Sequence, residues 1–164
     1  RSVSRGLGDV YKRQVWIDLS KGLGCPVGAV LAGSPEFIEE VWRWKQRIGG
    51  AMRQAGILAA AGLYALDNHL ERLAEDQDNA LAFAQAVEAF PQVAIDMESV
   101  QSNIVYFDIP GRDAAAVSAT LSAEGVEIGA MGTQTLRAVT HLDVSKEQVL
   151  KAAAVVGAVL ARNS

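Results

Sequence analysis

Two short apolar runs joined by a turn-rich segment constrain the beginning of this 164-residue chain. The runs cover residues 15–19 and 27–32, and their length and composition predict two buried strands. Between them lies the segment Ser-Lys-Gly-Leu-Gly-Cys-Pro, residues 20–26, in which glycine and proline favour a tight connection. We therefore expect two strands joined by a turn, with a lysine held at the end of the first strand.

Lys21 follows the first predicted strand directly, in a position where its charge cannot be buried cheaply. Gly22 and Gly24 have no side chains, so a flat ligand could approach the backbone closely. Desolvation by such a ligand would favour the neutral, nucleophilic amine that a Schiff-base lysine requires. Taken alone, the spacing favours a surface lysine at a turn, and the order Ser-Lys-Gly differs from that of the phosphate-binding loop.

Three blocks of this sequence resemble the low-specificity threonine aldolases, which are pyridoxal-phosphate enzymes of the β-eliminating lyase group. Residues 20–28 look like the lysine segment of that family, and residues 44–62 are similar to its Gly-Gly-Gly-Met-Arg-Gln segment. Residues 136–145 resemble its C-terminal signature, and the three blocks occur in the family's order. The chain departs from the family at Ala51, where many members have glycine, and at Gln46, where some have lysine.

The resemblance implies an α/β fold, the C-terminal part of the PLP-dependent transferase type that aspartate aminotransferase represents. We expect residues 1–14 to be a leader foreign to the family and residues 15–75 to be the C-terminal remnant of the PLP-binding large domain. Residues 76–164 would form the small C-terminal α/β domain. The family's groups for the pyridine nitrogen, the ring face and the phosphate lie upstream of the lysine. We therefore expect an inactive fragment, about half of an enzyme, that aggregates through residues 15–66.

The resemblance also assigns roles to three side chains. Lys21 would be the catalytic lysine that holds pyridoxal 5'-phosphate covalently. Arg53 follows Gly49-Gly50 at a predicted helix start, where it and the helix dipole could bind the cofactor phosphate, within one chain or across a subunit boundary. Arg137 would bind the substrate carboxylate through its planar fork. From the residues alone, a structural salt bridge for Arg53 and a surface strand position for Arg137 remain open.

The implied activity is that of a carbon–carbon lyase of amino acid metabolism, a PLP-dependent threonine aldolase. Such an enzyme cleaves threonine or allo-threonine to glycine and an aldehyde by retro-aldol chemistry. Two alternatives remain open at this point. The first is another PLP-dependent lyase or transferase of the same fold, such as an aromatic amino-acid lyase or a serine hydroxymethyltransferase-like enzyme. The second is a non-enzymatic α/β interaction domain.

The composition limits which binding partners and which cellular compartment we expect for this chain. The net charge of -4 argues against a nucleic-acid surface, and no apolar run approaches the roughly 20 residues of a membrane helix. The single cysteine, Cys25, permits no disulfide within the chain and fits the reducing cytoplasm. His69 lies among polar residues and is expected to be solvated, and we expect no metal. The expected ligand is a small amino acid, and we expect a full-length dimer or tetramer.

Helices are predicted in the middle of the chain. Ser34 and Pro35 are typical of a helix start, with serine as the cap and proline in the first turn. A long helix is predicted over residues 54–73, with a first half that is apolar all round and therefore buried. A further helix is predicted over residues 79–90, where Pro91 ends it.

The last part of the chain alternates strand and helix patterns. Strands are predicted over residues 93–97, 105–109, 126–130 and 136–142. A helix is expected between Asp113, as its cap, and Gly125, as its terminator. Ser145 and Gln148 have the spacing of a capping box for the last helix. We expect residues from about 93 to 164 to fold as a small domain without the rest.

Overall fold

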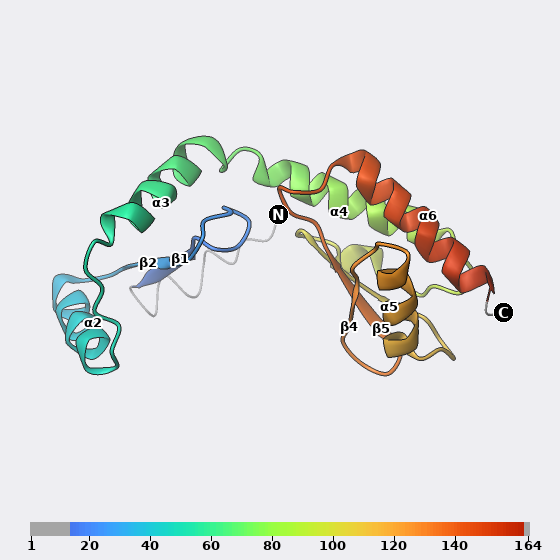
Figure 1. The fold of residues 1–164 in the computed structure, drawn as a ribbon, viewed down its shortest axis with the longest axis horizontal. Helices are drawn as coiled ribbons and strands as arrows, with labels where there is room; N and C mark the ends of the chain where they lie inside the picture. Colours follow the sequence, from blue (N-terminus) through green and yellow to red (C-terminus); the bar gives the residue numbers. More distant parts are fainter. Residues whose placement is uncertain (1–13, 163–164) are drawn as a thin grey trace. The chain divides into compact units, whose positions relative to one another are not determined.

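The computed structural model describes residues 14–162, so that the predicted leader lies outside the described residues except for Gln14. The chain divides into two compact units, the first ending at Glu71 and the second beginning at Arg72 (Figure 1). The domain boundary that we predicted from the sequence falls four residues later. Within residues 14–162, no helix is both long and apolar enough to cross a membrane.

The described part of the first unit contains two strands followed by two helices. Strands β1 (Val15–Asp18) and β2 (Ala29–Ala32) lie within the two predicted strand segments, and they pair antiparallel. Helices α2 (Pro35–Arg47) and α3 (Gly56–Asn68) follow. The predicted cap of α2 is confirmed, because the Ser34 hydroxyl accepts a hydrogen bond from the backbone N–H of Phe37 at 3.3 Å.

The apolar pattern of β1 and β2 does not correspond to burial within the described residues. The two strands pair only with each other there, and Trp16, Ile17 and Val30 are 69%, 49% and 51% exposed. Apolar strands of this kind are buried when further strands and covering helices surround them. The described residues provide no such layers, so the strand positions are confirmed while their burial is not.

The long helix predicted over residues 54–73 is shorter than expected, and the helix predicted over residues 79–90 begins earlier, at Leu73. Helix α3 ends at Asn68, and helix α4 (Leu73–Glu88) begins after a short connection. The Asn68 side chain donates a hydrogen bond to the Tyr64 carbonyl at 2.8 Å, and such local bonds compete with helix continuation. The first half of α3 is not buried either, since Ile57 is 77% exposed.

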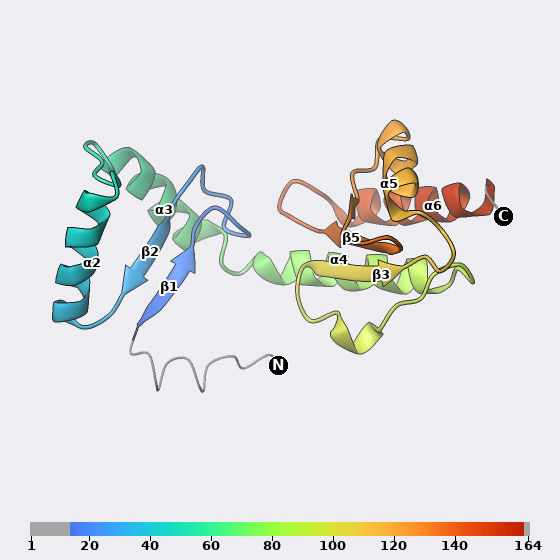
Figure 2. The same cartoon turned by 90° about the horizontal axis from the view of Figure 1, so that it is seen from below.

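The described part of the second unit combines a three-stranded antiparallel sheet with three α-helices. The strands are β3 (Ile104–Asp108), β4 (Gly129–Ala130) and β5 (Thr135–Val139), in the order β3-β5-β4. Helices α4 and α6 (Lys146–Arg162) pack side by side, and α4 also contacts β3 (Figure 2). Helix α5 (Ala114–Ala123) packs on α6, β4 and β5.

Three strands predicted for this unit are shorter than the pattern indicated, and one of them, predicted over residues 136–142, ends at Val139 as β5. The alternating stretch over residues 93–97 forms only an isolated bridge between Ala94 and Asp108, followed by the 3-10 helix η1 (Met97–Ser99). The stretch over residues 126–130 contributes only the two residues of β4 to the sheet. Alternation therefore identifies side-chain directions here but overestimates strand length.

The core of the second unit is continuous, and its members come from all of its helices and from β3 and β5. The largest fully buried members are Phe107, Ile109, Leu121, Leu136, Leu160, Val87, Val105, Val156 and Val159. The predicted N-terminal caps of α5 and α6 are both confirmed. The Asp113 carboxylate accepts from the Ala115 N–H at 2.9 Å. Ser145 and Gln148 form a reciprocal capping box, with bonds of 2.8 and 3.3 Å.

Candidate active site

Lys21 lies in a tight loop between β1 and β2, which we call the Lys21 loop (residues 19–28). The backbone N–H of Gly24 donates to the Lys21 carbonyl at 2.8 Å and closes a turn. Gly24 adopts φ +69°, a conformation that glycine accepts without strain. The N–H of Cys25 donates to the Leu19 carbonyl at 3.0 Å. The backbone on both sides of Lys21 is therefore fixed.

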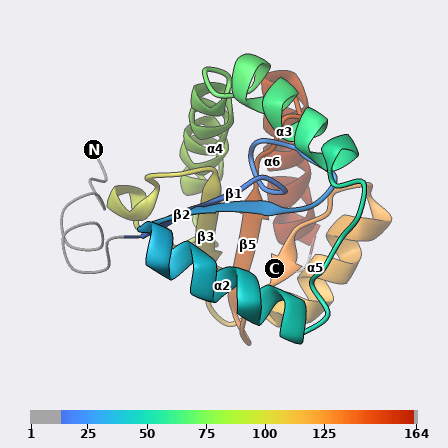
Figure 3. The same cartoon turned by 90° about the vertical axis from the view of Figure 1, so that its left-hand side faces the viewer.

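The Lys21 loop lies beside α3 (Figure 3), and its side chains Leu19 and Cys25 contact that helix. Leu19, Leu23 and Cys25 are at most 8% exposed, whereas most other residues of the loop are exposed. The Cys25 thiol lies 3.6 Å from the Ala61 carbonyl, to which it donates. A Cβ atom on Gly62 would lie 3.2 Å from the Leu19 Cδ1 atom, so glycine allows loop and helix to approach closely here.

His69, at the end of α3, also contacts the Lys21 loop. Its Nδ1 atom lies 2.7 Å from the Leu23 carbonyl, and because a carbonyl only accepts, Nδ1 carries the proton. The ring lies edge-on to Tyr64, with centroids 5.5 Å apart and planes at 88°. The prediction that His69 is solvated is therefore wrong. Its local neighbours in the sequence are polar, and they give no sign of a partner 46 positions earlier.

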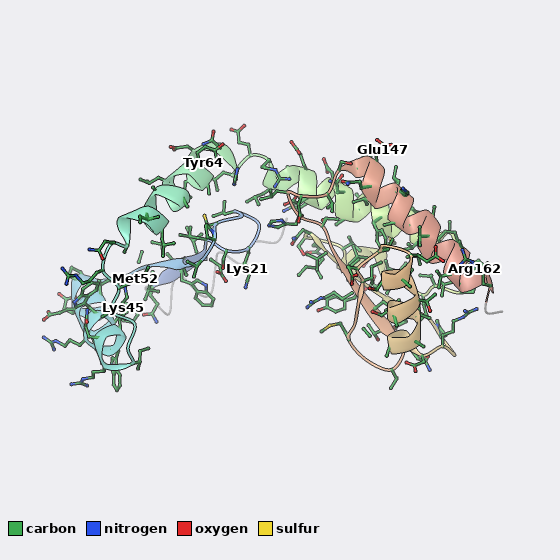
Figure 4. The ribbon with its side chains drawn as sticks, in the orientation of Figure 1. Lys21, Lys45, Met52, Tyr64, Glu147 and Arg162 are labelled. Atoms are coloured by element: carbon green, nitrogen blue, oxygen red, sulfur yellow. The ribbon has the colours of Figure 1, made fainter. Side chains whose placement is uncertain are left out.

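The amine of Lys21 is accessible. The side chain is 73% exposed and projects from the loop on the side away from α3 (Figure 4). Its Nζ atom lies 3.5 Å from Oδ2 of Asp18, and the other carboxylate oxygen, Oδ1, accepts a hydrogen bond from the Ser20 hydroxyl at 3.2 Å. The described residues therefore do not provide the desolvation that the sequence argument requires, but they leave Lys21 open to a ligand.

Arg53 is exposed in the bend before α3, as the sequence predicts for a helix start. The N-cap residue Ala55 offers no side-chain hydrogen bond to the first turn, and Gln54 has a positive φ of 55°. Among the described residues no salt bridge involves Arg53, so the structural-salt-bridge alternative has no support there. The Lys21 loop contacts the other half of α3, so the first unit does not bring Arg53 and Lys21 together.

Arg137 lies on the face of β5 opposite to the core. Its register partners are Tyr106 on β3 and Gly129 on β4, while Leu136 and Ala138 on either side are buried. The Arg137 Nε atom is buried and has no hydrogen-bond partner in the described part of the chain. An unsatisfied buried N–H costs about 1–3 kcal/mol, so an anionic ligand that accepts from it would be favoured.

A buried polar network fixes the end of β5 to α4. The Arg72 guanidinium donates to both carboxylate oxygens of Asp76, at 2.7 and 3.3 Å, and the Asp76 side chain is 2% exposed. The hydrogen bond from Arg72 to Asp76 raises the pKa of Arg72. The Thr140 hydroxyl donates to the Asp76 carbonyl at 2.5 Å, and the Asn103 amide donates to the Thr140 carbonyl at 2.7 Å. This network supports the strand that carries Arg137.

Sequence reasoning missed three residues beside the predicted ones. Asp18 could have been found as the only carboxylate within three residues of Lys21. Tyr106 could have been found only from the strand register, which no local pattern specifies. His69 had no sequence signal. No cluster of three or more possible metal ligands occurs within residues 14–162.

Comparison with known proteins identifies related sequences and folds. A family model described as beta-eliminating lyase matches residues 11–110, so it includes the last four residues of the predicted leader. The low specificity L-threonine aldolase of Escherichia coli O157:H7 is 44% identical over 146 residues, which cover 89% of this chain and 42% of that protein. The chain thus spans about two-fifths of the length of this curated relative.

Two solved structures show the same fold. A candidate L-allo-threonine aldolase from Listeria monocytogenes superimposes with a TM-score of 0.71 at 21% identity, covering 93% of this chain and 45% of that one. LysN, an α-aminoadipate aminotransferase from Thermus thermophilus, superimposes with a TM-score of 0.67 at 18% identity, covering 91% and 42%. The predicted fold class, part of a PLP-dependent transferase-type α/β fold, is confirmed.

Proposed function

This chain belongs to the β-eliminating lyase family, and from that premise we propose that the full-length protein is a PLP-dependent threonine aldolase. The reaction is the cleavage of threonine or allo-threonine into glycine and acetaldehyde. The observation that carries the proposal is Lys21, which has an exposed amine on a loop whose backbone is fixed on both sides. Similarity to the curated threonine aldolase supports this substrate class over that of the other enzymes that share the fold.

The residues present fit pyridoxal phosphate. An aldehyde can reach the Lys21 amine, because the side chain is 73% exposed and projects away from α3. Before the cofactor binds, the amine pairs with Asp18, whose carboxylate lies 3.5 Å from Nζ. When it is bound, pyridoxal phosphate supplies an electron sink for the bond that breaks at the substrate α carbon. The chain's own contribution at this point is to bind the group covalently and to orient it.

Arg137 is proposed to bind the substrate carboxylate. The orphaned Nε–H belongs to a guanidinium that can form two parallel hydrogen bonds to a carboxylate. The sheet is open at its register partner Gly129, where a built Cβ atom would meet nothing within 4 Å. Holding the carboxylate fixes the rotation of the substrate about the bond that is to break, which is the orientation effect on which such reactions depend.

Arg53 is proposed to bind the phosphate of the cofactor in a second copy of the protein. The separation of Arg53 from the Lys21 loop along α3 supports a role across a subunit boundary rather than within one chain. For the full-length protein we therefore propose a homo-oligomer, a dimer or tetramer. A cytoplasmic location is proposed because the one cysteine has no partner within the chain for a disulfide.

The test is an assay of the full-length protein with pyridoxal phosphate added. We expect glycine and acetaldehyde from threonine, and reduction with borohydride followed by peptide mapping should place the phosphopyridoxyl group on Lys21. Lys21→Ala should abolish turnover without changing the melting temperature, because the side chain it removes is exposed. A label on Lys45 or Lys151 would refute the assignment, and cofactor binding without glycine release would favour another enzyme of the same fold.

A further inference from the structure

The turn that carries Lys21 is attached to α3 by His69. Two other contacts between the Lys21 loop and α3 involve its flanks, through Cys25 and Leu19. The His69 contact is different, because Leu23 lies inside the turn that the Gly24 N–H closes onto the Lys21 carbonyl. Any movement of this turn relative to the helix therefore has to break the bond between His69 and Leu23.

We propose that His69 is a positioning residue for Lys21. Its Nδ1–H holds the Leu23 carbonyl and thereby fixes the direction in which the Lys21 amine leaves the loop. This inference rests on the proposed function, since it concerns the lysine that would bind pyridoxal phosphate. The role is one of orientation, because the ring contacts backbone and Tyr64 rather than the amine itself.

The surroundings of His69 keep its ring in this orientation. Its backbone N–H donates to the Ala65 carbonyl at 2.7 Å, which fixes the main chain at the end of α3. The Tyr64 ring packs edge-on against the imidazole. Because both ends of the hydrogen bond are fixed, the bond transmits the position of α3 to the turn.

This arrangement predicts a specific pattern among three variants of the full-length protein. His69→Ala removes the bond to Leu23. His69→Asn keeps a donor close to the place of Nδ1, so it should restore most of the effect. Asn68→Ala is the matched control, because it removes a side-chain hydrogen bond one residue away that stays within α3.

The first measurement is hydrogen–deuterium exchange of the cofactor-free proteins. We expect faster exchange in peptides from the Lys21 loop for His69→Ala, near-normal exchange for His69→Asn, and no change for Asn68→Ala. The second measurement is the affinity for pyridoxal phosphate, followed by its absorbance and by the yield of borohydride-reduced Lys21. Loss of one hydrogen bond should weaken binding about tenfold in His69→Ala.

The proposal is overturned if His69→Ala matches Asn68→Ala in loop exchange and in cofactor affinity. It is also overturned if His69→Ala lowers the melting temperature while the fraction that stays folded binds the cofactor normally. If the unmodified protein forms no adduct at Lys21, the proposed function fails. In that case the exchange data still decide whether His69 fixes the loop, so the two failures are distinguishable.

Discussion

Helix α4 should decide whether the second unit folds by itself. Its residues Ala80, Phe83, Ala84 and Val87 are at most 3% exposed and belong to the core of that unit. The sequence-based expectation that residues from about 93 onward fold without the rest therefore omits one side of the core. We expect a polypeptide of residues 72–164 to fold cooperatively and a polypeptide of residues 93–164 to remain unfolded.

The contribution of α4 to the stability of the second unit can be estimated from the four buried side chains. Burial of Phe83 and Val87 stabilises by about 1.5–3 kcal/mol each, and each alanine methyl adds about 0.8 kcal/mol, so α4 contributes roughly 5–8 kcal/mol. A unit of about 90 residues is expected to have a total unfolding free energy of roughly 5–14 kcal/mol. Deleting α4 thus removes an amount comparable to the whole stability.

The assay is urea denaturation of both polypeptides, followed by far-UV circular dichroism. Within residues 72–164, Phe83→Ala should lower the unfolding free energy by about 3–5 kcal/mol. Leu81→Ala is the matched control on the same helix, because Leu81 is 40% exposed, and it should cost much less. Equal urea midpoints for the two polypeptides, or equal losses for the two substitutions, would show that α4 does not complete this core.

Three further predictions concern the site and its support. Arg137→Lys should lower kcat/KM for threonine, with a rise of roughly 2–4 kcal/mol in activation free energy, because a point charge replaces a bidentate fork. Unchanged kinetics would return Arg137 to a surface role. Arg72→Ala should destabilise the second unit by about 3 kcal/mol, because it leaves the buried Asp76 carboxylate unpaired. Arg162→Ala, which removes an exposed pair with Glu124, should cost less than about 1 kcal/mol in the same urea titration. The 164-residue polypeptide alone should give no glycine from threonine, because it spans 42% of the length of the aldolase from E. coli, and turnover near that of a complete enzyme would refute this.

Features that depend on neighbouring residues could be predicted from the sequence. The cap at Ser34 and the capping box at Ser145 are confirmed because each requires only residues three positions apart. The face of β5 that carries Arg137 follows from alternation with the apolar residues Leu136 and Ala138. These are local rules of backbone geometry, and they hold whatever the rest of the chain does.

Features that depend on distant partners could not be predicted. The stretch around Ala94 alternates like a strand, but a strand exists only where a neighbour pairs with it, and the only pairing there is an isolated bridge to Asp108. The contact between His69 and Leu23 joins positions 46 residues apart. The orphaned Nε of Arg137 is likewise a property of packing, which no spacing in the sequence encodes.

The exposed apolar residues of the first unit connect the fold to the chemistry. Trp16, Ile48 and Ile57 are 69%, 78% and 77% exposed. Large apolar side chains that gather on one exposed surface are typical of interaction sites in soluble proteins. Strands β1 and β2 carry the Lys21 loop, and the Lys21 side chain is 73% exposed. A layer that covered β1 and β2 would therefore also exclude water beside Lys21 and provide the desolvation that a nucleophilic amine requires. Completion of the sheet and activation of the lysine would then be one event, and the first unit alone should self-associate in light scattering rather than bind the cofactor tightly.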